Sequence, residues 1–298
     1  MKKITKAVIT AAGLGTRMLP IAKSVPKEML PIIDKPAIQY IVEEAANAGI
    51  TDILIITGRD KQSIENHFDY SPEYTAALKN RQGGEERLEE LAAVTKLANI
   101  HYIRQKETKG LGHAVLCAKS FAGDDAFIVM YGDDVIIGEP PAAKQLVDTY
   151  EKYGVSVAGV RKVSREQLSL YCSLDVKAIN NSDDEFYVYD MNEKPKNPEE
   201  FFSDYAILGR VILTPEIFAI LEHQSPGING EIQLTDAMKT LARRAARGAP
   251  PKMTAKVFVG ERHDVGSKFG LLRANIIEGL KHRQTSEALK EFLKGLNI

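Results

Sequence analysis

An acidic pair that directly follows an apolar segment is the clearest candidate for chemistry in this sequence. The near-continuous apolar run 126–131 ends in Gly132-Asp133-Asp134. Residues after a buried parallel strand lie at the ligand-binding edge of an open α/β sheet, and carboxylates suit Mg²⁺, which also binds phosphate oxygens. Asp133 is therefore a candidate metal ligand, with a simple turn as the alternative. Asp264 follows the apolar run 256–259 and can face the same edge, although it also suits a helix cap.

A glycine-rich stretch near the N-terminus is suited to a polyphosphate. The apolar segment 7–10 runs into Ala11-Ala12-Gly13-Leu14-Gly15-Thr16-Arg17. Small residues let a ring or a phosphate approach the backbone, and consecutive amides can point into one concavity that suits an anion. Arg17 and Lys27 add positive charge. The spacing excludes a P-loop, and Met18 stands where the dinucleotide fingerprint needs a small residue.

Composition restricts the classes of partner. The chain has 298 residues, 44% hydrophobic and 27% charged, with a net charge of −1. This balance gives no electrostatic reason to expect nucleic acid or an anionic membrane as a partner, and no apolar run reaches the length of a membrane span. The cysteines, Cys117 and Cys172, exclude a disulfide framework and indicate a cytoplasmic protein.

The elements that must position these residues alternate between strands and helices, which predicts βαβ units. Strands are expected at 7–10, 52–57, 100–103, 126–131, 155–160, 173–177, 186–189, 206–213 and 256–259. Helices are expected at 36–48, over 60–98 with a break at 83–84, after 110, and at 215–221, 231–247, 266–281 and 285–295. The charge-rich segment 60–98 is interpreted as a solvated face. We expect an α/β fold with a Rossmann-like, open, mixed but mainly parallel sheet flanked by helices.

The string 11–17, together with Pro26-Lys27-Glu28-Met29-Leu30-Pro31, resembles the signature of the bacterial UTP–glucose-1-phosphate uridylyltransferases, which are sugar-phosphate nucleotidyltransferases. The resemblance extends over residues 4–281. It implies a single nucleotidyltransferase domain over 1–298, with a nucleotide-binding half over 1–135, a sugar-binding part over 136–265 and C-terminal helices over 266–298.

The resemblance also implies roles for single residues. The nucleotide contacts would be Ala11, Ala12, Gly13, Gly15, Glu28, Gln105 and Gly110. Gln105 can hydrogen-bond uracil through its amide, although a flipped amide would also accept cytosine. Asp133 and Asp264 would bind Mg²⁺, with Asp134 nearby. Lys194 would hold the sugar phosphate, and the sugar would contact Glu193, Gly209 and Cys172. Cys172 stands where the family usually has glycine, so the choice of sugar stays open.

The implied reaction joins UTP and glucose 1-phosphate into UDP-glucose and releases pyrophosphate. Arg17 and Lys27 would hold the triphosphate and the leaving pyrophosphate, and Lys194 would orient the attacking phosphate. The alternatives are a pyrimidine nucleotidyltransferase that uses dTTP or another sugar 1-phosphate, and a catalytically weak paralogue that senses nucleotide sugars. The loop spacing disfavours a nicotinamide dehydrogenase. The family implies a homodimer, for which the helices over 266–298 supply apolar positions.

Overall fold

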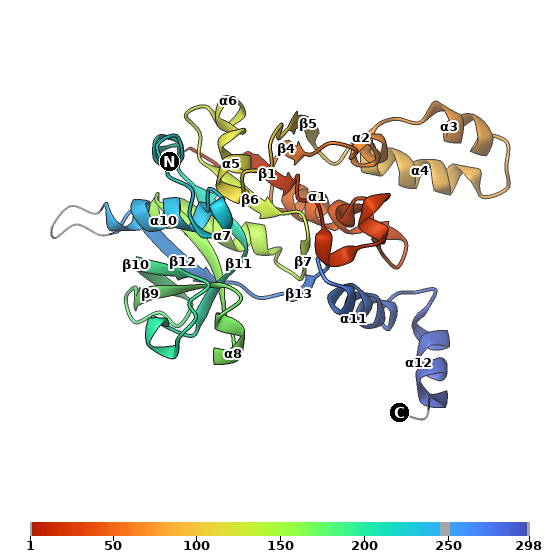
Figure 1. Cartoon of the computed structure of the whole chain (residues 1–298). Coiled ribbons are helices and arrows are strands. Elements are labelled where there is room, and N and C mark those ends of the chain that lie inside the picture. The colour runs from red at the N-terminus through yellow and green to blue at the C-terminus, as the bar shows by residue number, and fades with distance from the viewer. Residues whose placement is uncertain (1, 245–250, 297–298) are drawn as a thin grey trace.

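The computed structural model describes residues 2–244 and 251–296. Its centre is a nine-stranded sheet whose strands are, in spatial order, β5 (Asn99–Arg104), β4 (Asp52–Thr57), β1 (Lys6–Ala11), β6 (Phe127–Tyr131), β11 (Tyr205–Leu213), β8 (Ser156–Lys162), β12 (Met253–Val257), β10 (Glu185–Glu193) and β9 (Cys172–Ala178) (Figure 1). Each strand predicted from the sequence is present. The predicted bounds of β4 are those observed, because its apolar run is sharply delimited.

The sheet is mixed and flanked by helices, as predicted, but it is not mainly parallel: along the strand order given above, four neighbouring pairs are parallel and four are antiparallel. Strands β1, β4, β5 and β6 pair in parallel. Strand β11 runs antiparallel to both β6 and β8, and β12 then pairs in parallel with β8. Strands β9 and β10 are antiparallel, as their short connection predicts. The carboxyl ends of β1 and β6 therefore lie side by side at one edge of the sheet.

Helices cover both faces of the sheet. They are α1 (Ala37–Asn47) and α7 (Ala142–Tyr153) on one face, and α5 (Leu111–Leu116), α6 (Lys119–Ala122), α9 (Glu216–Leu221) and α10 (Leu234–Arg243) on the other. Side chains alternate along a strand, so Ile9 of β1 packs into the core with α1 and α7. Its neighbour Val8 packs into the core with α5, α9 and α10. Both positions are fully buried.

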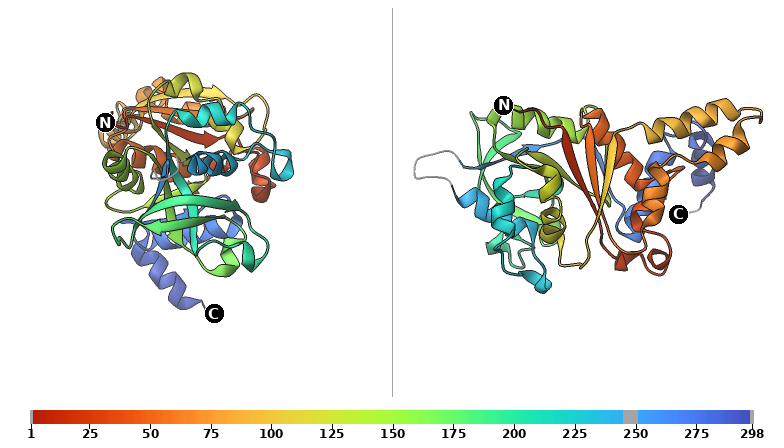
Figure 2. Two further views of the ribbon diagram at one scale, coloured as in Figure 1. Left: turned by 90° about the vertical axis from the view of Figure 1, so that its left-hand side faces the viewer. Right: turned by 90° about the horizontal axis from the view of Figure 1, so that it is seen from above.

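Two helical segments project from this core toward the same end of the molecule (Figures 1 and 2). The first contains α2 (Gln62–Phe68), α3 (Pro72–Leu78) and α4 (Gly84–Thr95), with the predicted break at Gly83, which has a φ of 72°. The second contains α11 (Lys268–Gly279) and α12 (Ser286–Gly295). Across residues 2–244 and 251–296, no helix combines the length and apolarity needed to cross a bilayer.

Several elements were not predicted from the sequence. They are β2 (Pro31–Ile32), β3 (Lys35–Pro36), β7 (Asp134–Ile137), β13 (Glu261–Asp264), α7, α8 (Arg165–Leu168) and the short 3-10 helices 16–18, 21–23, 27–29, 198–200 and 228–230. The helix predicted over 231–247 begins only at Leu234 and runs to Arg243, and residues 245–250 lie outside the described part. Asp264 ends the polar strand β13, not the apolar strand β12 as predicted.

Candidate active site

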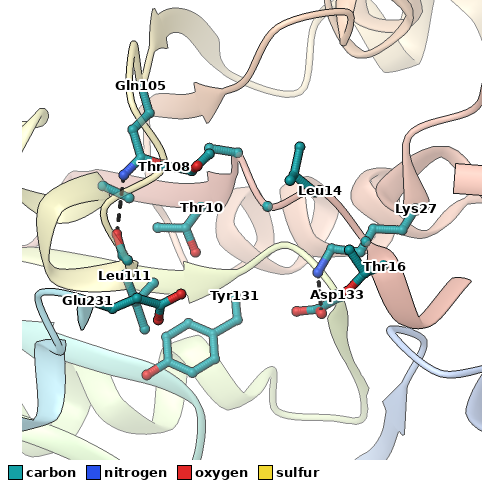
Figure 3. A pocket seen from close by; sticks show the side chains of 15 residues that line it. Thr10, Leu14, Thr16, Lys27, Gln105, Thr108, Leu111, Tyr131, Asp133 and Glu231 are labelled. Carbon is teal, nitrogen blue, oxygen red and sulfur yellow. Dashed lines mark hydrogen bonds and ion pairs between the residues drawn. The ribbon is translucent and has the colours of Figure 1, made fainter. Parts of the chain in front are cut away.

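A cavity of about 470 Å³ opens where β1 and β6 end. Figure 3 shows Gln105 and Thr108 at one end of it, Lys27 and Asp133 at the other, and Tyr131 along one side. Of the predicted site residues, those that line it are Ala12, Gly13, Gly15, Lys27, Gln105, Gly110 and Asp133. The structure thus brings together the glycine loop and the acidic turn, which are far apart in the sequence.

The glycine loop needs glycine most clearly at Gly15. This residue has a φ of 69°, in the left-handed region that favours glycine. A Cβ there would also lie 3.3 Å from the Cβ of Ala22 and 3.4 Å from the Cβ of Lys27. The loop therefore packs closely against the segment that carries Lys27, and this contact holds the lysine at the mouth of the cavity.

Asp133 lies at the centre of a charged cluster. Lys27 Nζ donates a hydrogen bond of 2.5 Å to Asp133 Oδ2, and Arg17 Nη2 lies 3.8 Å from the same oxygen. Burial alone would raise the pKa of Asp133, but the charges of Lys27 and Arg17 outweigh it and hold that pKa below its ordinary value. Asp133 is therefore an anion at neutral pH, as a metal ligand must be.

Asp264 reaches the same cluster from the far end of the sequence. Strand β13 pairs with β7, which follows Asp133 directly, and the backbone amide of Val265 donates to the carbonyl oxygen of Asp133 at 3.0 Å. Asp264 Oδ2 lies 4.0 Å from Arg17 Nη1. Within the described residues, no group of three or more acidic, histidine or cysteine side chains could hold a metal. The two carboxylates fit Mg²⁺, which takes its remaining ligands from phosphates and water.

Gln105 is fixed at the opposite end of the cavity. Its Nε2 donates to the carbonyl oxygen of Gly110 at 3.2 Å and lies 2.9 Å from His113 Nδ1. Gly110 has a φ of 96°, and a Cβ there would lie 2.7 Å from the Cβ of Glu231. Gly110 is thus needed both for its conformation and for the close approach of the Glu231 segment.

A second cavity, of about 800 Å³, shares Tyr131 and Asp133 with the first and contains the predicted sugar contacts. In it, Arg262 donates from Nε and Nη2 to the two carboxylate oxygens of Asp134 at 2.7 and 2.8 Å, and from Nη1 to Tyr171 Oη at 3.2 Å. Gly209, with a φ of 70°, packs against this pair, because a Cβ there would lie 2.7 Å from Asp134 Oδ2. The Asp134 carboxylate is therefore paired with Arg262, although Asp134 lies directly opposite Asp264 in the pairing of β7 with β13.

Lys194 and Glu193 lie in this second cavity. Lys194 has a φ of 47°, which is unusual outside glycine. Its backbone amide donates to the carbonyl oxygen of Tyr171 at 3.0 Å, and its Nζ lies 3.7 Å from Glu193 Oε1. Burial raises the pKa of Glu193 despite the opposing charge of Lys194. A strained backbone at a charged cavity residue is typical of functional sites.

Cys172 lines the same cavity but is only 3% exposed. Its side chain belongs to the hydrophobic core formed with α5, α9 and α10, and burial raises the pKa of its thiol well above the ordinary value. The thiol therefore packs mostly into the protein, which explains how a side chain replaces the usual glycine there.

Two predicted nucleotide contacts lie beneath the loop and outside the cavity wall. Ala11 and Glu28 are both 0% exposed. The Glu28 carboxylate binds Lys61, a residue that the sequence analysis assigned to a solvated face. Arg262, Tyr131 and Glu231 also line the cavities and were not predicted from the sequence. Tyr131 ends the apolar strand before Asp133, so its position at the sheet edge was the one available signal.

Comparison with known proteins points to the same family as the resemblance in the sequence. The chain is 49% identical over 296 residues to "UTP--glucose-1-phosphate uridylyltransferase YngB" of Bacillus subtilis, covering 98% of this chain and 95% of that protein. It is 48% identical to a UTP–glucose-1-phosphate uridylyltransferase of Staphylococcus epidermidis over the full length of both. A solved UDP-glucose pyrophosphorylase complexed with UDP-glucose superposes with a TM-score of 0.83 at 40% identity, covering 94% of this chain and 100% of that one.

A UTP-bound enzyme from Acinetobacter baumannii superposes with a TM-score of 0.86 at 34% identity, over 99% of this chain and 100% of that one. The family model for nucleotidyl transferases matches residues 6–276. The resemblance found in the glycine loop and the Lys27 segment is thereby confirmed over almost the whole sequence. This chain belongs to the nucleotidyl transferase family and groups within it with the UTP–glucose-1-phosphate uridylyltransferases.

Proposed function

We propose that this protein makes UDP-glucose and pyrophosphate from UTP and glucose 1-phosphate. The observation that carries the proposal is the meeting of two cavities at Asp133, one lined by the glycine loop and one by Lys194. A nucleotide in the first cavity and a sugar phosphate in the second would bring their phosphates together beside this acid. The relatives named for this reaction support the assignment.

The residues at the junction act by position and charge. The attacking phosphate oxygen of glucose 1-phosphate is already anionic, so the site needs no general base. This oxygen forms a bond to the α-phosphorus of UTP as the bond to the β-phosphate oxygen breaks, and pyrophosphate leaves with the electron pair. Two polyanions repel each other, so positive charge must be positioned where they meet. Arg17 and Lys27 would hold the triphosphate, and Lys194 would orient the sugar phosphate.

The metal in this proposal is Mg²⁺, held by Asp133 and Asp264. When bound, it would neutralise charge on the reacting phosphates. Asp133 and Asp264 are kept within reach of each other by the pairing of β7 with β13. Arg17 lies near both carboxylates and is exposed, with 63% of its side chain accessible, so it is free to turn toward an incoming phosphate.

Each of the two cavities would bind one of the two substrates. We propose that residues 1–135 bind the nucleotide and residues 136–265 bind the sugar phosphate, within one domain.

We also propose that two copies associate, because Phe269, Leu272 and Phe292 of the C-terminal helices are exposed apolar residues. The free cysteines Cys117 and Cys172 fit a cytoplasmic enzyme. Analytical ultracentrifugation tests the dimer.

Release of pyrophosphate, measured by a coupled assay, tests the activity. The assay pairs UTP, dTTP and CTP with the 1-phosphates of glucose, galactose, mannose and N-acetylglucosamine, in Mg²⁺. We expect UTP with glucose 1-phosphate to give the highest kcat/KM, and the Asp133→Asn variant to serve as the inactive control. Preference for dTTP would point to a thymidylyltransferase, and failure of all pairs would point to a nucleotide-sugar sensor.

A further inference from the structure

Lys61 is a buried lysine in the segment whose composition indicates a solvated surface. It precedes α2 and is only 7% exposed. Its ammonium group donates to the carbonyl oxygens of Ala11 and of Gly13, the latter at 2.8 Å, and to both carboxylate oxygens of Glu28 at 3.0 and 2.9 Å. These partners come from the end of β1, from the glycine loop and from the turn that carries Lys27.

The acceptors around Lys61 Nζ match the donors of an ammonium group in number. A lysine ammonium has three N–H donors, whereas a neutral amine has only two. Lys61 faces three acceptor groups, namely two carbonyls and one carboxylate. The ammonium form satisfies all three with one N–H group each, and burial, which lowers the pKa of Lys61 and raises the pKa of Glu28, is opposed by the charge that each group presents to the other. A buried pair of this kind resists the loss of either partner, since an unpaired charge would remain.

The contacts also orient the glycine loop. In a trans peptide, the N–H group points opposite to the C=O group that precedes it. Because Lys61 holds the carbonyls of Ala11 and Gly13, the amides of Ala12 and Leu14 point away from Lys61. Ala12 and Leu14 line the first cavity, and Lys61 does not. Lys61 thus lies on the protein side of the loop while the amides turn toward the cavity side.

We propose that Lys61 is a positioning residue for the nucleotide, which holds the loop and the Lys27 turn in the form that accepts the triphosphate. The inference rests on the proposed function for the identity of the nucleotide. It assigns Lys61 no contact with substrate. Loss of its contacts would let the loop peptides rotate and would detach the Lys27 turn through Glu28. Binding of UTP should weaken, while binding of the sugar phosphate in the second cavity should change little.

The test uses a double variant that leaves no buried charge unpaired. Lys61→Met with Glu28→Gln removes both charges at similar side-chain volume. The matched control is Lys6→Met, because Lys6 also donates to a backbone carbonyl, that of Ala122 at 3.1 Å, and to a carboxylate, that of Asp125 at 3.0 Å. Lys6 lies at the opposite end of β1 from the glycine loop. Thermal unfolding first shows that each variant is folded.

The expected result is an increase of about 10- to 100-fold in KM for UTP in the double variant, with KM for glucose 1-phosphate within about twofold of the wild type. Hydrogen exchange of the peptide over residues 11–17 should be faster than in the wild type and in Lys6→Met. An unchanged exchange rate, or an equal rise in both KM values, would overturn the inference. The exchange measurement needs no activity, so an inactive wild-type protein would count against the proposed function alone.

Discussion

The backbone amide of Val265 donates to the carbonyl oxygen of Asp133 at 3.0 Å. This hydrogen bond, together with the pairing of β7 and β13, joins two acids that are separated in the sequence by residues 134–263. Asp133 and Asp264 both lie near the guanidinium group of Arg17, at 3.8 and 4.0 Å. Because backbone contacts hold the two acids in place, substitutions of neighbouring residues should affect the site even when neither acid is replaced.

Gly266 offers the sharpest test of this arrangement. A Cβ at Gly266 would lie 2.5 Å from Asp133 Oδ2 and 2.7 Å from Arg17 Nη2, so Gly266→Ala must displace both side chains or its own backbone. We expect kcat to fall by about 100-fold and the Mg²⁺ concentration for half-maximal activity to rise. The matched control is Gly295→Ala, because a Cβ at Gly295 meets no heavy atom of the described residues within 4 Å. Normal kinetics in a folded Gly266→Ala variant would contradict this prediction, because they would show that Asp133 and Arg17 need not keep these positions.

Arg262 lines the second cavity and should also stabilise the folded protein. Asp134 is only 4% exposed, and Arg262→Met would leave its carboxylate unpaired. We expect the free energy of unfolding to fall by about 3–5 kcal/mol, measured by urea titration. Arg262→Lys keeps the charge but loses the two-pronged geometry, so its loss should be intermediate. The interpretation fails if Arg262→Met is as stable as the wild type.

Substitution of Cys172 tests whether its thiol limits the binding of the sugar phosphate in the second cavity. Because the side chain packs into the core, we expect Cys172→Gly to lower the free energy of unfolding by about 2 kcal/mol and to leave KM for glucose 1-phosphate unchanged. Cys172→Ala separates the lost thiol from the added backbone freedom. A lower KM for glucose 1-phosphate in the glycine variant would instead mean that the thiol narrows the second cavity.

His67 should make stability depend on pH. Burial lowers the pKa of His67 below its ordinary value of 6.5, although Glu43 opposes the shift. The unfolded chain therefore binds a proton more readily than the folded protein does, and this contribution to stability is present above about pH 6.5 and lost as the pH falls through the lower, folded pKa. Urea titrations between about pH 7 and pH 5 should show a shallower decline for His67→Asn than for the wild type. Parallel declines would exclude this role.

Local patterns in the sequence predicted most of the central sheet. Strand β4 is a short apolar run between polar residues, and α1 ends before the predicted stop at Gly49, which has a φ of 87°. Helix α7 was missed although it follows Pro141 and ends at Gly154, which are ordinary helix signals. Strand β13 has a polar sequence and forms only by pairing with β7, so no local pattern indicates it.

The candidate site was predictable where it depends on strand ends and the glycine loop. Asp133 follows an apolar strand and indeed lies at the sheet edge. The assignment of Lys61 to a solvated face was wrong, and the burial of Glu28 was not predicted, because the burial of a charged residue depends on partners distant in the sequence. Arg262 was missed for the same reason, since only the folded chain brings it against Asp134.

A crystal structure with UDP-glucose and Mn²⁺, in which anomalous scattering locates the metal, tests most directly whether Asp133 and Asp264 hold the metal at the junction of the two cavities. We expect an anomalous peak in contact with a carboxylate oxygen of both Asp133 and Asp264, with the uracil beside Gln105 and the hexose beside Lys194. A metal bound away from either acid, or a nucleotide outside the cavity lined by Gly13 and Gln105, would contradict it.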